Sequence, residues 1–177
     1  PQLQRRAAPA SGARSVAHLY DMQHDPVLRE EMTYPSPASG QRIGLSFITP
    51  RTQEELRLRT RMMLHWARYS GGMMGRSPDY LNVSLMASAA AAEFYVQNDP
   101  RFADNVRNYY TYVRENDLCL THTLVNPQAN RALTATGHPS AEVAARIVKE
   151  TNKGIVIRGA RILATLGPLS DEIAVFP

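Results

Sequence analysis

Residues 74–97 have the sequence MGRSPDYLNVSLMASAAAAEFYVQ, which holds both the start and the full length of a predicted helix. Ser77 is a favourable N-cap, Pro78 suits the first helical position, and Asp79 complements the positive end of the helix dipole. We therefore predict a helix over residues 80–97. Its alanine-rich middle would let a neighbouring helix or a ligand approach closely.

The same segment has features of a site. Arg76 would lie just outside the helix and Tyr80 in its first turn. A cation, a phenol and a helix N-terminus would then meet at one point, an arrangement that stabilises developing negative charge. An ordinary capped helix with a surface arginine and a core tyrosine would give the same pattern, so the residues alone leave both interpretations open.

Two further helices flank this one. Thr52 and Glu55 have the spacing of a capping box, and Gly71-Gly72 is typical of a helix C-terminus, so we predict a helix between them. Asp99-Pro100 precedes another predicted helix, over residues 102–118. Apolar side chains expected on or beside the packing faces of these helices are Leu56, Met62, Met63, Trp66, Tyr69, Val106, Tyr109, Tyr110 and Val113.

The remainder of the chain changes from helical to extended character. The first part is expected to contain a loose leader (1–14), a short helix that stops near residue 24, a loop (33–40) and a short extended segment (43–48). The last part is expected to contain a polar loop (121–131), a helix of about ten residues from residue 139, two short strands (154–164) and a final strand (172–176).

The composition indicates a globular protein. The chain has 177 residues, 44% of them hydrophobic, and a net charge of +4 with basic and acidic residues interspersed. No basic run is interleaved with aromatics, so nucleic-acid binding is not predicted, and no apolar stretch is long enough to span a bilayer. The single cysteine fits a reducing, cytoplasmic setting. The chain begins at Pro1 and ends at Pro177 directly after a predicted strand, so we expect a piece of a longer protein.

His122 is the main candidate for proton transfer. It lies where the helical part gives way to a polar loop, and an imidazole has an intrinsic pKa of about 6.5. A buried histidine satisfied by hydrogen bonds is the alternative. The other histidines have no partner at metal-ligand spacing, so no protein-bound metal is predicted, and Cys119 is expected to be an inert buried thiol. Residues 165–171 form either a plain turn or a loop that binds a flat polar ring.

Three motifs then occur in order: MGRSPDY at residues 74–80, LTHTLVNPQANR at 120–131 and KETNKGIVIRGA at 149–160. Together they resemble the oxygenase component of two-component flavin monooxygenases, typified by the 4-hydroxyphenylacetate 3-monooxygenase family. Residues 12–21 also resemble the early helix of that family, so the resemblance spans nearly the whole chain.

The resemblance implies an α+β fold of the acyl-CoA-dehydrogenase-like kind. A helical N-terminal domain with its leader and connecting loop would occupy residues 1–138, and the beginning of a β-barrel-like middle domain would occupy residues 139–177. The C-terminal helical bundle that closes the flavin site would be missing, so this fragment alone would be inactive. The resemblance further implies a homodimer or homotetramer.

The activity implied by the resemblance is ortho-hydroxylation of a phenol. It uses O2 and reduced FAD from a separate flavin reductase, through a C4a-hydroperoxyflavin. Arg76, Tyr80 and His122 would hold the phenol near its phenolate form, with His122 as hydrogen-bond partner and base, Tyr80 as a second partner and Arg76 as the positive charge. Which phenol is bound stays open. The flavin-contact positions implied are His122, Thr123, Gln128 and Thr165.

Two other functions stay open at this point. A flavin and iron–sulfur dehydratase or isomerase of the 4-hydroxybutyryl-CoA dehydratase type shares the implied architecture, but its cluster needs several cysteine ligands and this chain has one cysteine. A non-catalytic helical interaction module would explain the short length and the mixed charge.

Overall fold

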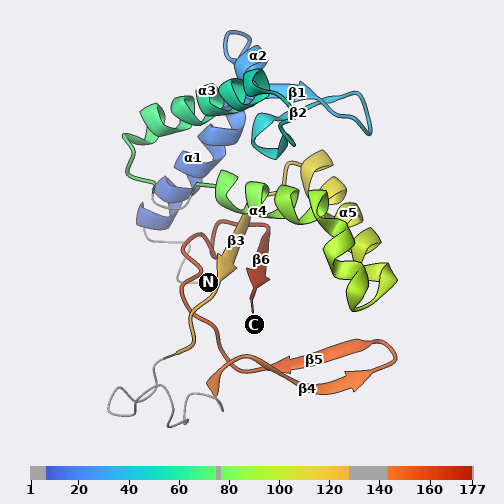
Figure 1. Ribbon diagram of the computed structural model, residues 1–177. Coiled ribbons are helices and arrows are strands. Elements are labelled where there is room, and N and C mark those ends of the chain that lie inside the picture. The colour runs from blue at the N-terminus through green and yellow to red at the C-terminus, as the bar shows by residue number, and fades with distance from the viewer. Residues whose placement is uncertain (1–6, 75–76, 128–142, 177) are drawn as a thin grey trace.

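The computed structural model describes residues 7–74, 77–127 and 143–176, and for residues 7–10 it describes the backbone only. Helices dominate the first part of the chain, which also holds one short strand pair, and short strands make up the last part (Figure 1). The α-helices and 3-10 helices (η) are α1 (Ala7–Asp21), η2 (Met22–His24), α2 (Arg29–Met32), η3 (Leu45–Phe47), α3 (Gln53–Ser70), α4 (Asp79–Ala90), η4 (Ala92–Gln97) and α5 (Pro100–Glu115).

The strands form three separate pairs. β1 pairs antiparallel with β2, β4 antiparallel with β5, and β3 parallel with β6. Their bounds are β1 (Thr33–Pro35), β2 (Arg42–Gly44), β3 (Leu120–Thr123), β4 (Arg146–Thr151), β5 (Gly154–Arg158) and β6 (Glu172–Val175).

The α4 helix occupies the middle of the molecule. It contacts η3, β3 and α5. In Figure 1 it crosses between the α1–α3 pair above and the β3–β6 pair below. Side chains at the start of α4 therefore reach both the helical core and the small parallel sheet.

The α3 helix confirms the predicted capping box. The Thr52 hydroxyl accepts a hydrogen bond from the Glu55 N–H (3.1 Å), and a Glu55 carboxylate oxygen accepts one from the Thr52 N–H (2.9 Å). Gly71 ends the helix at φ 60°, a left-handed conformation that favours glycine. Leu56 is half exposed, so its placement at the packing face was wrong. Tyr69, expected beside that face, is also half exposed, and its ring contacts His18 of α1.

The first helix begins earlier than predicted. Within the described chain, α1 starts at Ala7, so the expected leader is wrong for residues 7–14. Pro9 is tolerated there because an N–H in the first helical turn has no intrahelical acceptor, so its loss costs no helix hydrogen bond. Val16 and Leu19 anchor the helix because both are buried.

The central helix differs from its prediction at both ends. Its cap residue is Pro78, which makes no side-chain capping bond, so the prediction of Ser77 as N-cap is off by one residue. Pro78 already has helical dihedral angles (φ −57°, ψ −29°). At the other end Ala91 leaves helical geometry and a 3-10 helix, η4, follows in place of one helix to residue 97. η4 packs on α5, and the break occurs in spite of the helix propensity of the alanines.

The α5 helix starts two residues before its predicted start at residue 102 and ends three residues before its predicted end at residue 118. The Asp99 carboxylate accepts a hydrogen bond from the Arg101 N–H (2.8 Å), which fixes the N-cap, and Pro100 takes the first helical position. Tyr110 and Val113 are buried as predicted.

The extended segments contain more strand than predicted. The expected loop over 33–40 begins with β1, and the expected extended segment over 43–48 is split between the end of β2 and η3. The first residues of the loop expected over 121–131 belong to β3. Where a helix was expected, over about residues 139–151, the structure has the strand β4 instead. Residues 128–142 lie outside the described chain. A two-residue turn joins Thr151 to Gly154, which makes β4 and β5 a hairpin.

The final strand is confirmed over Glu172–Val175, and β5 confirms the first of the two short strands predicted over 154–164. The second is only two isolated bridges, Ala144 with Ala160 and Val125 with Ile162. Because β3 precedes the predicted domain boundary at 138 and β6 follows it, the two predicted domains share a sheet; the boundary itself stays a prediction.

Two of the three buried clusters in the described residues join several helices. One joins α1, α3 and η3, where the Trp66 ring nitrogen donates to the Leu19 carbonyl (3.0 Å). The other joins η3, α4, α5 and β3, where the Tyr110 hydroxyl donates to the Phe47 carbonyl. Members of the second cluster are Phe47, Leu81, Met86, Tyr110, Val113 and Leu120.

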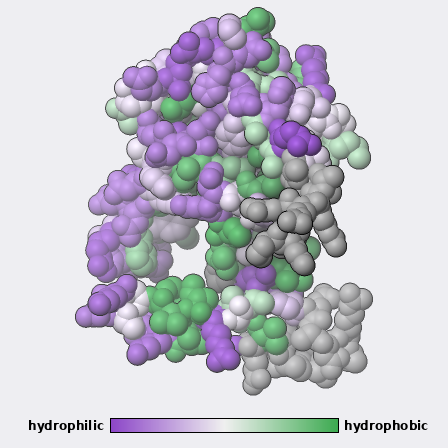
Figure 2. Space-filling model, turned by 180° about the vertical axis from the view of Figure 1, so that it is seen from behind, coloured by the Kyte–Doolittle hydropathy of each residue, from purple (hydrophilic) through white to green (hydrophobic). Residues whose placement is uncertain are grey.

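The β4–β5 hairpin carries a large exposed apolar surface. Every residue of both strands is exposed. Figure 2 shows this as a hydrophobic patch over the hairpin. Its apolar members are Ile147, Val148, Ile155, Val156 and Ile157. No helix in the described part of the chain is long and apolar enough to cross a membrane.

Candidate active site

The parallel pair β3–β6 fixes the position of His122. All four residues of β3 are buried, and His122 lies opposite Ala174 of β6. Because side chains alternate along a strand, His122 shares a face with Leu120, which packs into the α4–α5 cluster. The imidazole is therefore directed to the α4 side of the sheet.

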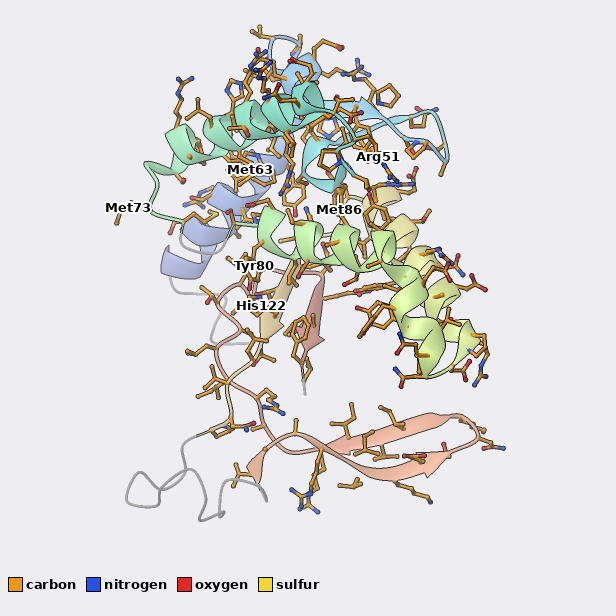
Figure 3. The ribbon with its side chains drawn as sticks, viewed as in Figure 1. Arg51, Met63, Met73, Tyr80, Met86 and His122 are labelled. Atoms are coloured by element: carbon orange, nitrogen blue, oxygen red, sulfur yellow. The ribbon has the colours of Figure 1, made fainter. Side chains whose placement is uncertain are left out.

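Tyr80 meets His122 from the first turn of α4. The two rings are stacked, with centroids 4.9 Å apart and planes 25° apart, and Figure 3 shows them side by side below α4. The His122 side chain is buried (7% exposed), whereas Tyr80 is 48% exposed. The pair thus joins a shielded imidazole to a phenol that a ligand can reach.

Phe176 completes an aromatic corner that the sequence did not indicate. Its ring lies edge-on to His122, with centroids 6.2 Å apart and planes 80° apart. Phe176 was placed at the end of a strand, but that strand's partner was not known, so its proximity to His122 could not be inferred. The backbone supports the contact, because the Phe176 N–H donates to the Thr123 carbonyl (3.2 Å).

The other two described site residues lie elsewhere. The buried Thr123 hydroxyl donates to the Ile162 carbonyl (2.7 Å), and by strand alternation it faces away from His122. Thr165 is exposed and lines a cavity of about 530 Å³ with Ser15, Tyr69, Ser70, Met73, Met74 and Leu166. Four predicted site residues are described, and among them the structure brings Tyr80 and His122 into direct contact, whereas Thr123 and Thr165 lie elsewhere.

Two predicted site residues lie outside the part of the chain that the structure describes. Arg76 and Gln128 belong to segments 75–76 and 128–142, which the structure does not describe. Their roles stay predictions.

Two charged side chains near the start of α4 were not recognised as important from the sequence. Asp79 is 7% exposed and its Oδ1 atom is buried without a hydrogen bond. The Nε atom of Arg59, on α3, is also buried without one. Burial lowers the pKa of Arg59, and the negative charge of Asp79 partly opposes that shift. The only sequence indication was Arg59's place in the apolar row of α3.

Cys119 and Tyr20 border a cavity of about 570 Å³ between α1 and the loop of residues 168–171. Burial is the main reason that the pKa of both groups is raised. Cys119 is buried, as predicted, and a protonated thiol is a poor nucleophile. Among the residues that the structure describes, no group of three or more His, Cys, Asp or Glu side chains could hold a metal ion.

Comparison with known proteins connects this geometry to a family. The family model described as 4-hydroxyphenylacetate 3-hydroxylase N terminal matches residues 4–177. The chain belongs to this family. A relative, the 4-hydroxyphenylacetate 3-monooxygenase oxygenase component of Thermus thermophilus, is 51% identical over 164 residues, covering 93% of this chain and 33% of the relative. The chain thus spans about a third of the length of the curated relatives it matches.

Solved structures support the same assignment. The crystal structure of the HpaB oxygenase component complexed with FAD and 4-hydroxyphenylacetate matches with a TM-score of 0.83 and 51% identity, over 93% of this chain and 33% of that one. A 4-hydroxybutyryl-CoA dehydratase from N. maritimus matches with a TM-score of 0.72 at 18% identity, over 92% of this chain and 32% of that one, which shows the fold alone. The predicted family and the acyl-CoA-dehydrogenase-like α+β fold are confirmed.

Proposed function

We propose that this chain is the N-terminal part of an oxygenase component that ortho-hydroxylates a phenol with O2 and reduced FAD. The observation that carries the proposal is the stack of Tyr80 on His122, two residues from separate family motifs that the fold brings together. The membership of the chain in the 4-hydroxyphenylacetate family adds support.

The described residues fit a flat aromatic ligand. Tyr80 offers a half-exposed ring and a hydroxyl, and Phe176 presents a ring edge-on to the buried His122. Reduced FAD, when bound, would supply the electrons that activate O2. The protein's part is to bind the phenol, orient it and control its proton.

His122 is proposed as the group that accepts the phenol proton. A phenol has a pKa of about 10 and a histidine about 6.5, so the transfer needs help from neighbours that stabilise the phenolate. Tyr80 would donate a second hydrogen bond to the phenolate oxygen, and Arg76 would supply positive charge. Removal of the proton makes the ring a stronger nucleophile at the ortho carbon. Burial of His122 in a paired strand keeps its ring in one orientation.

The flavin contacts are proposed at His122, Thr123, Gln128 and Thr165. The Thr123 hydroxyl already donates to a carbonyl, so it would serve a flavin only as an acceptor. Thr165 is exposed and can meet a ligand without rearrangement.

The whole protein would work with partners. We propose a separate flavin reductase as the source of reduced FAD, assembly as a homodimer or homotetramer, and a cytoplasmic location. Because the chain covers 33% of its relative, we also propose that residues 1–177 alone bind FAD weakly and are inactive. Tight binding by this fragment in a flavin fluorescence titration would contradict that statement.

The test uses the full-length protein with a generic flavin reductase, FAD, NADH and 4-hydroxyphenylacetate as the probe phenol. Wild type should form a catechol, detected by chromatography. His122→Ala should lower the rate by about 100-fold or more, the effect of removing a general base. His24→Ala is the matched control, since His24 is an exposed histidine. Absence of catechol in wild type would refute the function, and a wild-type rate in His122→Ala would refute the site.

A further inference from the structure

Phe176 follows β6 and lies on the same face of the small parallel sheet as His122. His122 is opposite Ala174 in the register, and side chains alternate along each strand, so Ala174 and Phe176 point to the side of His122. Ala174 packs against the α4–α5 cluster, which makes this the α4 side of the sheet. The Phe176 N–H donates to the Thr123 carbonyl (3.2 Å), so the backbone pairing extends as far as Phe176.

The His122 imidazole therefore meets aromatic rings from both α4 and the end of β6. Tyr80 stacks on it, with centroids 4.9 Å apart and planes 25° apart, and Phe176 lies edge-on to it, with centroids 6.2 Å apart and planes 80° apart. Both separations and both orientations are those that aromatic pairs prefer. A ring that has one partner face-on and another edge-on has little freedom to tilt or turn.

The Phe176 ring contributes little to the hydrophobic core. The side chain is 39% exposed, and it belongs to none of the three buried clusters of the described residues. Its backbone hydrogen bond does not depend on the side chain. His122 itself is only 7% exposed, so the rings of Tyr80 and Phe176 form part of its cover against water. The ring of Phe176 thus serves the imidazole more than the core.

We propose that Phe176 is a positioning residue: its ring gives the His122 imidazole a second aromatic contact and so keeps the base oriented toward the phenol. The kinetic consequence rests on the proposed function, because a general base must lie within hydrogen-bond reach of the proton that it accepts. Phe176 acts through His122 and not on the reacting atoms.

The kinetic test is a double-mutant cycle in the full-length enzyme with 4-hydroxyphenylacetate as the probe phenol. Phe176→Leu keeps an apolar side chain and removes the ring, so kcat should fall by about 3- to 10-fold, the loss of one aromatic pair, with a smaller change in KM. Phe176→Tyr keeps the ring and should retain kcat within about twofold. In a His122→Ala background, Phe176→Leu should change kcat by about twofold or less, because the group through which it acts is absent.

Phe94→Leu is the matched control. Phe94 is an exposed phenylalanine of η4, and it also meets another ring edge-on, that of Tyr95, with centroids 5.6 Å apart and planes 85° apart. The η4 helix packs on α5. Loss of this ring should leave kcat within about twofold of wild type.

A readout independent of turnover separates this contact from the proposed function. Diethyl pyrocarbonate modifies accessible imidazoles, and mass spectrometry of peptides gives the rate at each histidine. Phe176→Leu should raise the rate at His122 by about 2- to 10-fold, because one of the rings that hold and cover the imidazole is gone. Phe176→Tyr and Phe94→Leu should leave that rate unchanged. The exposed His24 is the internal reference and should react equally in all variants.

An unchanged modification rate at His122 in Phe176→Leu would overturn the proposal. An equal fold loss of kcat in the wild-type and His122→Ala backgrounds would also overturn it, since the effect would then not pass through His122. A loss of kcat in Phe176→Tyr as large as in Phe176→Leu would do the same, because the ring is retained. Lack of catechol from wild type would overturn the proposed function and leave the modification test intact.

Discussion

Replacing Tyr80 by phenylalanine removes one hydroxyl and keeps the ring that stacks on His122. The stack, with centroids 4.9 Å apart, is worth about 0.5–1.5 kcal/mol and is retained. Since the side chain is 48% exposed, the free energy of unfolding should change by less than about 0.5 kcal/mol. If the hydroxyl donates to the phenolate in the transition state, its loss removes about 1.5–3 kcal/mol of stabilisation. That energy corresponds to a fall in kcat of about 10- to 100-fold.

The assay compares Tyr80→Phe with Tyr80→Ala in the full-length enzyme. Catechol formation under saturating 4-hydroxyphenylacetate gives kcat, and urea denaturation gives the free energy of unfolding. Tyr80→Ala should lose activity and also about 0.5–1.5 kcal/mol of stability, because the stack disappears. A Tyr80→Phe enzyme with wild-type kcat would refute the hydrogen-bonding role. Equal destabilisation of the two variants would show that the ring contact does not stabilise the site.

Three further predictions concern the scaffold. Thr52→Ala removes one half of the capping box of α3 and should lower the free energy of unfolding by about 1 kcal/mol, measured as a shift of the urea midpoint. Tyr110→Phe leaves the buried Phe47 carbonyl without its donor and should cost about 1–3 kcal/mol, measured in the same way; no shift would mean that the carbonyl finds another partner. Hydrogen bonds from Arg101 lower the pKa of Asp99 to about 2, so its contribution to stability is present above pH 4 and is lost as the pH falls toward 2. Asp99→Asn should therefore flatten that part of a pH–stability curve, and an unchanged curve would contradict the assignment.

The parts of the fold that depend on neighbouring residues were predictable. Thr52, Glu55 and Gly71 define α3 by contacts within a few positions, and the structure confirms both ends. Residues that depend on distant partners were not. His122 was placed in a loop because its strand partner, Ala174, is far along the chain and no local pattern reveals the pairing.

In the site too, contacts between neighbouring residues were predictable and contacts between distant residues were not. The stack of Tyr80 on His122 agrees with their grouping, which came from the family motifs and not from spacing. Asp79 was explained by the helix dipole, a local effect, but it is also buried, beside a cavity lined by residues of α1 and α3. Phe176 could not be linked to His122 until the parallel register of β3 and β6 was known.

That register also sets when the site can form during synthesis. His122 and its ladder partner Ala174 are 52 residues apart. A ribosome adds about 5–20 residues per second, so β6 follows β3 by about 3–10 s. For that interval Tyr80, α4 and the helical clusters are already made, while the strand that carries His122 has no partner on this edge. The described helices are thus made before the imidazole is held in place, and the order of translation makes His122 the last part of the pair to be fixed.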